Sequence, residues 1–167
     1  MNMVENNNPM PWQLKKFTEL TTLELYYIYK LRSDIFVVEQ DCVYPDLDGL
    51  DILPETYHLF ATSNQLVMAY LRLLAVDTSY PNMSALGRVV IHPDFRGQQL
   101  GHQLLSRATQ FLDEKWPEHI CHISAQSHLA KFYQQHGYSI VTDEYLEDGI
   151  PHIGMERPAK NNKAELT

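Results

Sequence analysis

The chain has 167 residues and a net charge of −8, because 21 Asp and Glu residues outnumber 13 Lys and Arg residues. A chain of this length buries roughly 70% of its unfolded surface, so one core suffices without a disulfide or a structural metal. The excess of acid argues against a nucleic-acid partner, because phosphate binding needs a surplus of Lys and Arg. No apolar stretch approaches the roughly 18 residues of a membrane span.

The two cysteines, Cys42 and Cys121, have a spacing that fits no redox or metal motif, and no signal peptide precedes Trp12. These features favour a reduced, soluble, cytoplasmic protein without a membrane partner. Residues 1–11 are polar and rich in Asn, and residues 159–167 are polar and charged. Both ends are therefore expected to be disordered tails around one domain, residues 12–158.

The first predicted elements are a strand over residues 12–17 and a helix that begins at a capping box of Thr21 and Glu24. The apolar spacing of this helix marks one buried face, made of Leu25, Ile28, Leu31 and Ile35.

An acidic stretch follows, in which no Lys or Arg occurs between Arg32 and Arg72. Its seven carboxylates belong to Asp34, Glu39, Asp41, Asp46, Asp48, Asp51 and Glu55. Two interpretations stay open: a solvated loop, or a negative mouth that attracts a cationic amine. A calcium loop over residues 46–51 is a third, disfavoured by the position of Gly49.

Strands are predicted over residues 57–63 and 65–76, joined by a short hairpin, and over residues 86–91. A helix over residues 98–115 ends before Pro117. A strand over 120–125, a helix over 127–136 with Gly137 at its C-terminal end, and strands over 138–145 and 152–156 complete the chain. The order β-α-β-β-β-α-β-α-β-β indicates an α/β (α+β) fold, a central mixed sheet of six or seven strands flanked by helices.

The most informative segment runs from Val89 to Gly101, where a β-branched strand ends at His92-Pro93 and a glycine-spaced loop opens a helix. The first N–H groups of a helix have no partner within it and carry partial positive charge, so an anion is stabilised there. Gly97 and Gly101 would let the backbone approach that anion closely.

The string Arg96-Gly97-Gln98-Gln99-Leu100-Gly101 resembles the acetyl-CoA-binding signature of the GCN5-related N-acetyltransferases. It departs from that signature at Gln99, where glycine is usual. Residues 126–138 resemble the family's second signature, with Gln126 in the place of the commoner Asn and with the Phe132-Tyr133 pair in place. The strings 36–40 and 147–155 resemble the ElaA-type subgroup.

The resemblance implies acetyl-CoA as co-substrate and no metal. The strand at Val89 would pair with pantetheine and direct an N–H group at the developing oxyanion. The implied cofactor-binding residues are Val89, Val90, Ile91, Arg96, Gly97, Gln98, Gln99, Leu100, Gly101, His102, Gln126 and Tyr133.

Tyr133 matches the tyrosine of the family that returns a proton to the departing thiolate, although a buried helix tyrosine that only packs would look the same. The base that takes the amine proton is expected among Glu39, His58 and His152, with His152 the first choice. A metal site made of His119, Cys121 and His122 is disfavoured, because strand alternation puts His122 on the opposite face from the other two.

We therefore expect an N-acetyltransferase that moves the acetyl group of acetyl-CoA to a primary amine by direct attack in a ternary complex. The acceptor would be a small-molecule or peptide amine, and a homodimer is an assembly that the sequence allows. Two other classes stay open: a non-catalytic acyl-CoA-binding or sensing module, and a phosphate-binding regulator that uses only the loop of residues 96–101.

Overall fold

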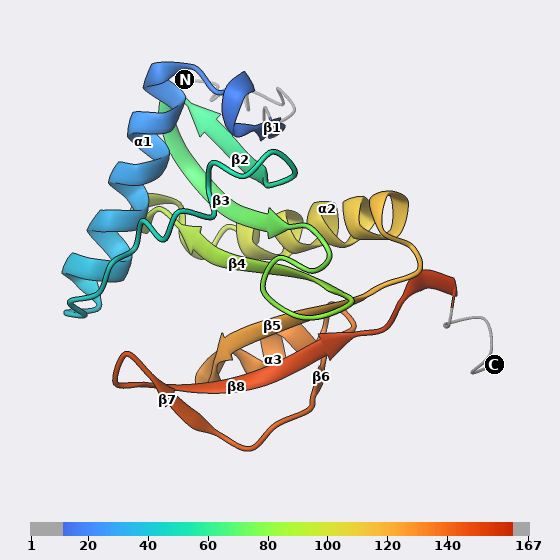
Figure 1. The fold of residues 1–167 in the computed structure, drawn as a ribbon. Helices are drawn as coiled ribbons and strands as arrows, with labels where there is room; N and C mark the ends of the chain where they lie inside the picture. The colour runs from blue at the N-terminus through green and yellow to red at the C-terminus, as the bar shows by residue number, and fades with distance from the viewer. Residues whose placement is uncertain (1–11, 162–167) are drawn as a thin grey trace, which may run out of the picture.

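The computed structural model describes residues 12–161 as one mixed sheet with helices on both faces (Figure 1). The strands are β1 (Trp12–Lys16), β2 (Tyr57–Ser63), β3 (Leu66–Leu74), β4 (Met83–Ile91), β5 (Ile120–Gln126), β6 (Ser139–Ile140), β7 (Tyr145–Glu147) and β8 (Ile150–Arg157). The helices are α1 (Thr22–Arg32), which continues as a π-helical segment (Ser33–Glu39), α2 (Leu100–Lys115) and α3 (Ala130–Gln134). Short 3₁₀ turns cover Phe17–Glu19, Pro93–Phe95 and Ser127–Leu129.

The sheet has eight strands in the order β1-β2-β3-β4-β5-β8-β6, with β7 paired to β8. All neighbours run antiparallel except β4 and β5, which α2 connects as a parallel pair. This arrangement confirms the predicted mixed α/β fold. An eighth strand is present because the predicted strand over 138–145 contains only β6 and the first residue of β7, which runs on to Glu147 after an irregular stretch.

Strand alternation divides the core into two layers. On β2, Leu59 and Ala61 face α2, whereas Phe60 between them faces α1. The layer between the sheet and the helices α2 and α3 is the larger. The layer on the other face of the sheet packs Ile28 and Leu31 of α1 against strand residues such as Phe60. The capping box predicted for α1 is present: Thr21 Oγ1 accepts from the Glu24 N–H at 3.1 Å.

The terminal segments 1–11 and 162–167, both predicted as tails, lie outside the described residues. Order extends a little beyond the predicted end of the domain at residue 158. Ala159 is buried, and the N–H of Asn161 donates to the carbonyl of Pro117 at 3.4 Å. Within residues 12–161, no helix has the length and apolar character needed to cross a membrane.

The sheet is split at its centre. β4 and β5 pair only at Met83 with Ile120, Ser84 with Cys121 and Ala85 with His122, and then part. Beyond Ala85, the edge of β4 that faces β5 has no strand partner among the described residues, and the lower half of the molecule, β5 to β8, diverges from the upper half (Figure 1).

Candidate active site

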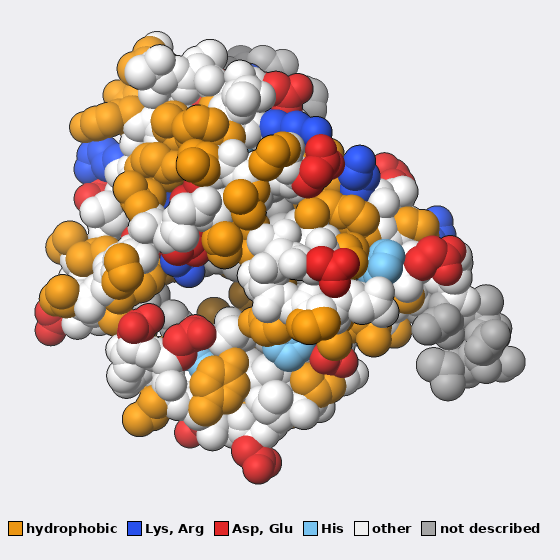
Figure 2. Space-filling view, viewed as in Figure 1, with side chains coloured by type: hydrophobic (Ala, Val, Ile, Leu, Met, Phe, Trp, Pro, Cys, Tyr) orange, Lys and Arg blue, Asp and Glu red, His pale blue; other side chains and the backbone are white. Residues whose placement is uncertain are grey.

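A cavity of about 460 Å³ lies where β4 and β5 part. Figure 2 shows the molecule hollowed between its two halves, with acidic side chains along the lower rim. Four of the residues predicted from the sequence line this cavity: Val89 on β4, Gln126 at the end of β5, Tyr133 on α3 and His152 on β8. The fold thus brings together side chains that are up to 63 positions apart in sequence (89 to 152).

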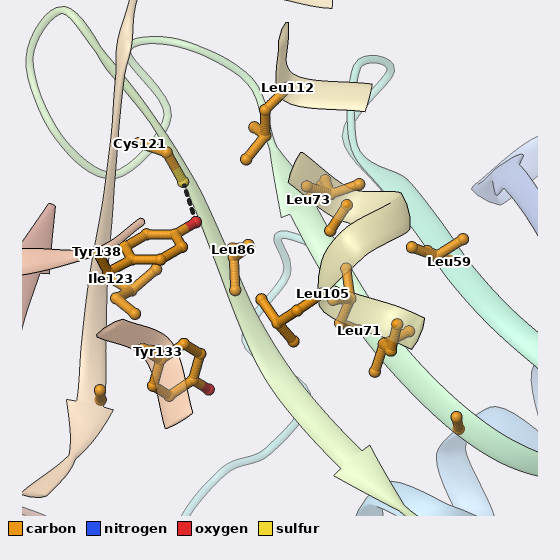
Figure 3. Packing of buried hydrophobic residues seen from close by; sticks show 14 of the residues in the cluster. Leu59, Leu71, Leu73, Leu86, Leu105, Leu112, Cys121, Ile123, Tyr133 and Tyr138 are labelled. Atoms are coloured by element: carbon orange, nitrogen blue, oxygen red, sulfur yellow. Dashed lines mark hydrogen bonds between the residues drawn. The ribbon is translucent and has the colours of Figure 1, made fainter. Parts of the chain in front are cut away.

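Tyr133 lines the cavity from α3. Its ring packs edge-on against Phe132 and Tyr138, and its hydroxyl makes no hydrogen bond to any of residues 12–161. Figure 3 shows this hydroxyl pointing toward the β4 side, whereas the hydroxyl of Tyr138 donates to Cys121 Sγ at 3.2 Å. Burial raises the pKa of Tyr133 well above its ordinary value, so the phenol keeps its proton at neutral pH.

His152 enters the cavity from β8, opposite Gln126 in the sheet register. Its Nδ1 lies 2.7 Å from the carbonyl oxygen of Ile150, and a carbonyl only accepts, so Nδ1 carries a proton. Its other nitrogen, Nε2, lies 3.2 Å from Glu147 Oε2. The ring is therefore held with Nε2 as the nitrogen that can gain a proton, next to a carboxylate.

Glu147 of β7 completes this side of the cavity, Tyr145 lies beside it, and neither was predicted as a site residue. Ser124 Oγ on β5 lies 2.5 Å from the hydroxyl of Tyr145 and 3.3 Å from Glu147 Oε2. The sequence held a signal for this arrangement. Asp148 and Gly149 both have positive φ and form a two-residue hairpin turn between β7 and β8, and Asp-Gly is the dipeptide that such turns favour.

The predicted cofactor loop lies at the start of α2, outside the lining of the cavity. Gly97 has φ +77°, and Gln99 is the N-cap of α2 with φ 63°, so both have left-handed backbone. The first N–H groups of α2 point away from the helix without an intrahelical partner. No acidic side chain lies in the first turn of α2, and this absence suits an anion there.

Gly101 and His102 have neighbours that sequence reasoning did not foresee. A Cβ on Gly101 would meet the ring of Phe132 at 3.4 Å, an ordinary van der Waals contact, so α2 packs on α3 here with room for a small side chain. His102 Nδ1 lies 2.9 Å from His136 Nε2, and the two rings stack.

Glu39 and Arg96, predicted as a base and as a cofactor contact, bind each other. The guanidinium of Arg96 donates to both carboxylate oxygens of Glu39, at 2.7 and 2.6 Å. Neither side chain lines the cavity. Hydrogen bonding to Arg96 lowers the pKa of Glu39, which makes it a weaker base.

The left-handed conformation of Gln99 leads to a stability prediction. A residue with a Cβ pays about 1 kcal/mol for this backbone, and glycine pays none, although its larger unfolded-state entropy offsets part of the gain. Gln99→Gly is therefore expected to raise the free energy of unfolding by about 0.5 kcal/mol, with unchanged acetyl-CoA affinity. Urea denaturation measures the change. Gln98→Gly is the control because residue 98 has no positive φ, and an equal gain there would contradict this explanation.

The acidic stretch is largely neutralised by basic side chains. Six of its seven carboxylates form ion pairs, and Asp41 alone has none among the described residues. Three of the six are held by arginines that come from α1, β3 and β4: Arg32, Arg72 and Arg88. Burial opposes ionisation of Asp48, but hydrogen bonds from Arg72 lower the pKa of that carboxyl to about 2. The hypothesis of an open negative mouth is therefore wrong for most of this stretch.

Arg32 is the centre of that network and is wholly buried. Its Nε lies 3.0 Å from Asp46 Oδ2, and its Nη1 lies 2.6 Å from Asp51 Oδ1. The side chains of Tyr29 and Tyr70 lie against the guanidinium. These contacts attach residues 46–51, which form neither helix nor strand, to α1 and to the sheet.

His58 also belongs to this buried region and does not line the cavity. Its Nε2 donates to the carbonyl of Asp51 at 3.0 Å, and its Nδ1 accepts from the hydroxyl of Tyr70 at 2.8 Å. Burial lowers the pKa of His58 and keeps it neutral. These contacts, away from the cavity, indicate a structural role for His58. Across residues 12–161, no three His, Cys, Asp or Glu side chains are grouped so that they could hold a metal ion.

Comparisons with known proteins agree on one family. An acetyltransferase (GNAT) domain matches residues 49–158. Protein ElaA of Escherichia coli is 40% identical over 146 residues, which are 87% of this chain and 95% of that protein. The crystal structure of E. coli ElaA superposes with a TM-score of 0.83 at 38% identity and covers 89% of this chain and 99% of that one. An acyl-CoA N-acyltransferase from Pseudomonas aeruginosa gives a TM-score of 0.84 at 44% identity, with the same coverage.

Proposed function

Because the chain belongs to the GCN5-related N-acetyltransferase family, in its ElaA-like branch, we propose that it transfers the acetyl group of acetyl-CoA to a primary amine. The amine would attack directly while both substrates are bound. The single observation that carries the proposal is the cavity at the split of the sheet, which Tyr133 and His152 both line, from α3 and β8.

The chain offers a place for each part of acetyl-CoA, which supplies the acetyl group as a thioester. Beyond Ala85, the edge of β4 that no described strand covers carries N–H and C=O groups that can pair with the amide groups of pantetheine. The N–H groups at the start of α2 suit the pyrophosphate. The side chain of Gln126, which lines the cavity, can bind a pantetheine amide after leaving its 3.2 Å hydrogen bond to Gln40.

The positions of the protons on Tyr133 and His152 assign one proton transfer to each of these side chains. Tyr133 is a protonated phenol and serves as the acid for the thiolate that leaves. In its neutral form His152 carries its lone pair on Nε2 and serves as the base for the amine, because an ammonium ion must lose a proton before it can attack. We give Glu39 no part as the base, because Arg96 holds both of its oxygens.

Acetyl transfer can be tested directly with acetyl-CoA and a panel of spermidine, cadaverine, tyramine and lysine methyl ester. We expect release of free CoA that depends on the amine, together with a mass gain of one acetyl group on at least one panel member. Calorimetry measures acetyl-CoA binding in parallel. Binding without transfer to any amine would contradict the enzymatic proposal and favour a non-catalytic acyl-CoA-binding module. Equally tight binding of CoA and of simple nucleotides would favour a phosphate-binding regulator.

A further inference from the structure

A chain of close polar contacts leads from His152 to the surface along the β7–β8 hairpin. His152 Nε2 lies 3.2 Å from Glu147 Oε2, and Ser124 Oγ lies 3.3 Å from the same oxygen. Tyr145 OH lies 2.5 Å from Ser124 Oγ, and its ring stacks on that of His152 at 6.3 Å. Tyr145 is directly opposite His152 in the register of the two strands, so the hairpin fixes the whole group.

The direction of each hydrogen bond follows from its partners. A carboxylate only accepts, so Ser124 donates its hydroxyl hydrogen to Glu147. The hydroxyl of Tyr145 must then donate to Ser124 Oγ. The remaining approach to Glu147 Oε2 comes from His152 Nε2, which can donate there only after it has gained a proton. Ser124 therefore holds the carboxylate in place and is itself bound by Tyr145, and the imidazole is the group that can deliver a proton to the carboxylate.

We propose that Glu147 takes the proton that His152 removes from the acceptor amine and releases it to solvent, while Ser124 and Tyr145 position its carboxylate. This inference rests on the proposed acetyl transfer. Glu147 is a proton-release residue that acts through His152.

The proton balance of the reaction requires such an exit. An ammonium acceptor loses two protons on its way to an amide: one leaves on the CoA thiol, and the other must reach water before His152 can act again. The His152 side chain is only 11% exposed, whereas that of Glu147 is 49% exposed. A proton on Glu147 can thus pass to solvent directly, whereas one on His152 has no comparable access.

No basic side chain competes for Glu147 among its described neighbours. The titratable groups around it are His152 and Tyr145 of the hairpin and Asp148 of its turn, with Tyr80 from the β3–β4 connection and His122 from β5 nearby along the cavity wall. His122 has its own carboxylate, because its Nδ1 lies 3.0 Å from Glu156 Oε1. This second His–Glu pair joins β5 to β8, whereas His152 and Glu147 join β8 to β7, and it provides a control on the same sheet.

The test compares Glu147→Gln with Glu156→Gln, using the panel amine that the wild-type enzyme acetylates fastest. Glu147→Gln is expected to lower kcat about 10-fold or more, with the KM for acetyl-CoA within twofold of wild type. Glu156→Gln is expected to leave both unchanged.

In Glu147→Ala, added formate should restore turnover in proportion to its concentration, because a diffusible carboxylate can accept the proton. Ser124→Ala should show a smaller loss, without formate rescue. A wild-type kcat in Glu147→Gln, or a loss in Glu147→Ala that formate does not repair, would overturn the proposal.

A second readout does not depend on activity. In ¹⁵N spectra of the histidine side chains, the Nε2 resonance of His152 should shift in Glu147→Gln and stay in place in Glu156→Gln. An unchanged resonance in Glu147→Gln would show that the two groups are not coupled and would overturn the inference, whatever the turnover. If no amine in the panel is acetylated by wild type, the proposed function fails separately, and the spectra still decide whether Glu147 is bound to His152.

Discussion

Replacement of Arg32 by Met is expected to lower the free energy of unfolding by about 3 to 5 kcal/mol, the largest change in stability that we predict. Methionine fills much of the space, but it removes one of the two arginines that pair with each of the buried carboxylates of Asp46 and Asp51. Removal of one member of a buried ion pair costs far more than the pair contributes, because the remaining charge has lost both water and its counter-charge. Urea denaturation followed by circular dichroism measures the difference.

The matched control is Lys30→Met, two residues earlier on the same helix. Lys30 pairs with Asp34 at 2.5 Å, but both side chains are about half exposed, and such surface pairs contribute roughly 0.5 kcal/mol or less. A loss in Arg32→Met no larger than that in Lys30→Met would mean that water reaches Asp46 and Asp51 and that the network does not hold residues 46–51.

Tyr133→Phe is expected to lower kcat about 100-fold or more, with little change in the affinity for acetyl-CoA. The substitution removes the one protonated oxygen that we assign to the thiolate and keeps the ring that packs against Phe132 and Tyr138. Steady-state kinetics give kcat, and calorimetry gives the affinity.

Tyr138→Phe separates this catalytic effect from packing. Tyr138 is equally buried, but its hydroxyl donates to Cys121 and does not line the cavity. This variant should lose a little stability and keep its turnover. Equal turnover in wild type and Tyr133→Phe would leave Tyr133 as a packing residue and assign the proton to another group.

The elements that could be predicted from sequence are those with local signals. The capping box at Thr21, the glycine-spaced entry to α2 and the alternation along β5 each depend on residues within a few positions of one another. The π-helical continuation of α1 carries no such signal. The turn at Asp148 and Gly149 did carry one, and its omission caused Glu147 to be missed although His152 was chosen.

The charge network could not be predicted, because its members are distant in sequence. Arg32 meets Asp46 across 14 residues, and Arg88 meets the same aspartate across 42. Composition alone showed a run of carboxylates without Lys or Arg, and the simplest interpretation was a field directed at a substrate. Only the three-dimensional fold shows that arginines of α1, β3 and β4 neutralise them. Glu39 and Arg96 illustrate the same limit, because two residues predicted for separate roles bind each other.

The split of the sheet also has a consequence for the order of folding. The strands β2 to β4 form a meander of neighbours in sequence, and β7 with β8 forms a tight hairpin, so both units close through short loops. The β4–β5 pairing, by contrast, joins Met83 to Ile120 through only three residue pairs and must first order the long crossover that contains α2. Long loops cost more entropy to close than short ones, and a contact of three residue pairs offsets only a small part of that free-energy cost. We therefore expect the two halves to form early and their junction, the place where the cavity opens, to form last.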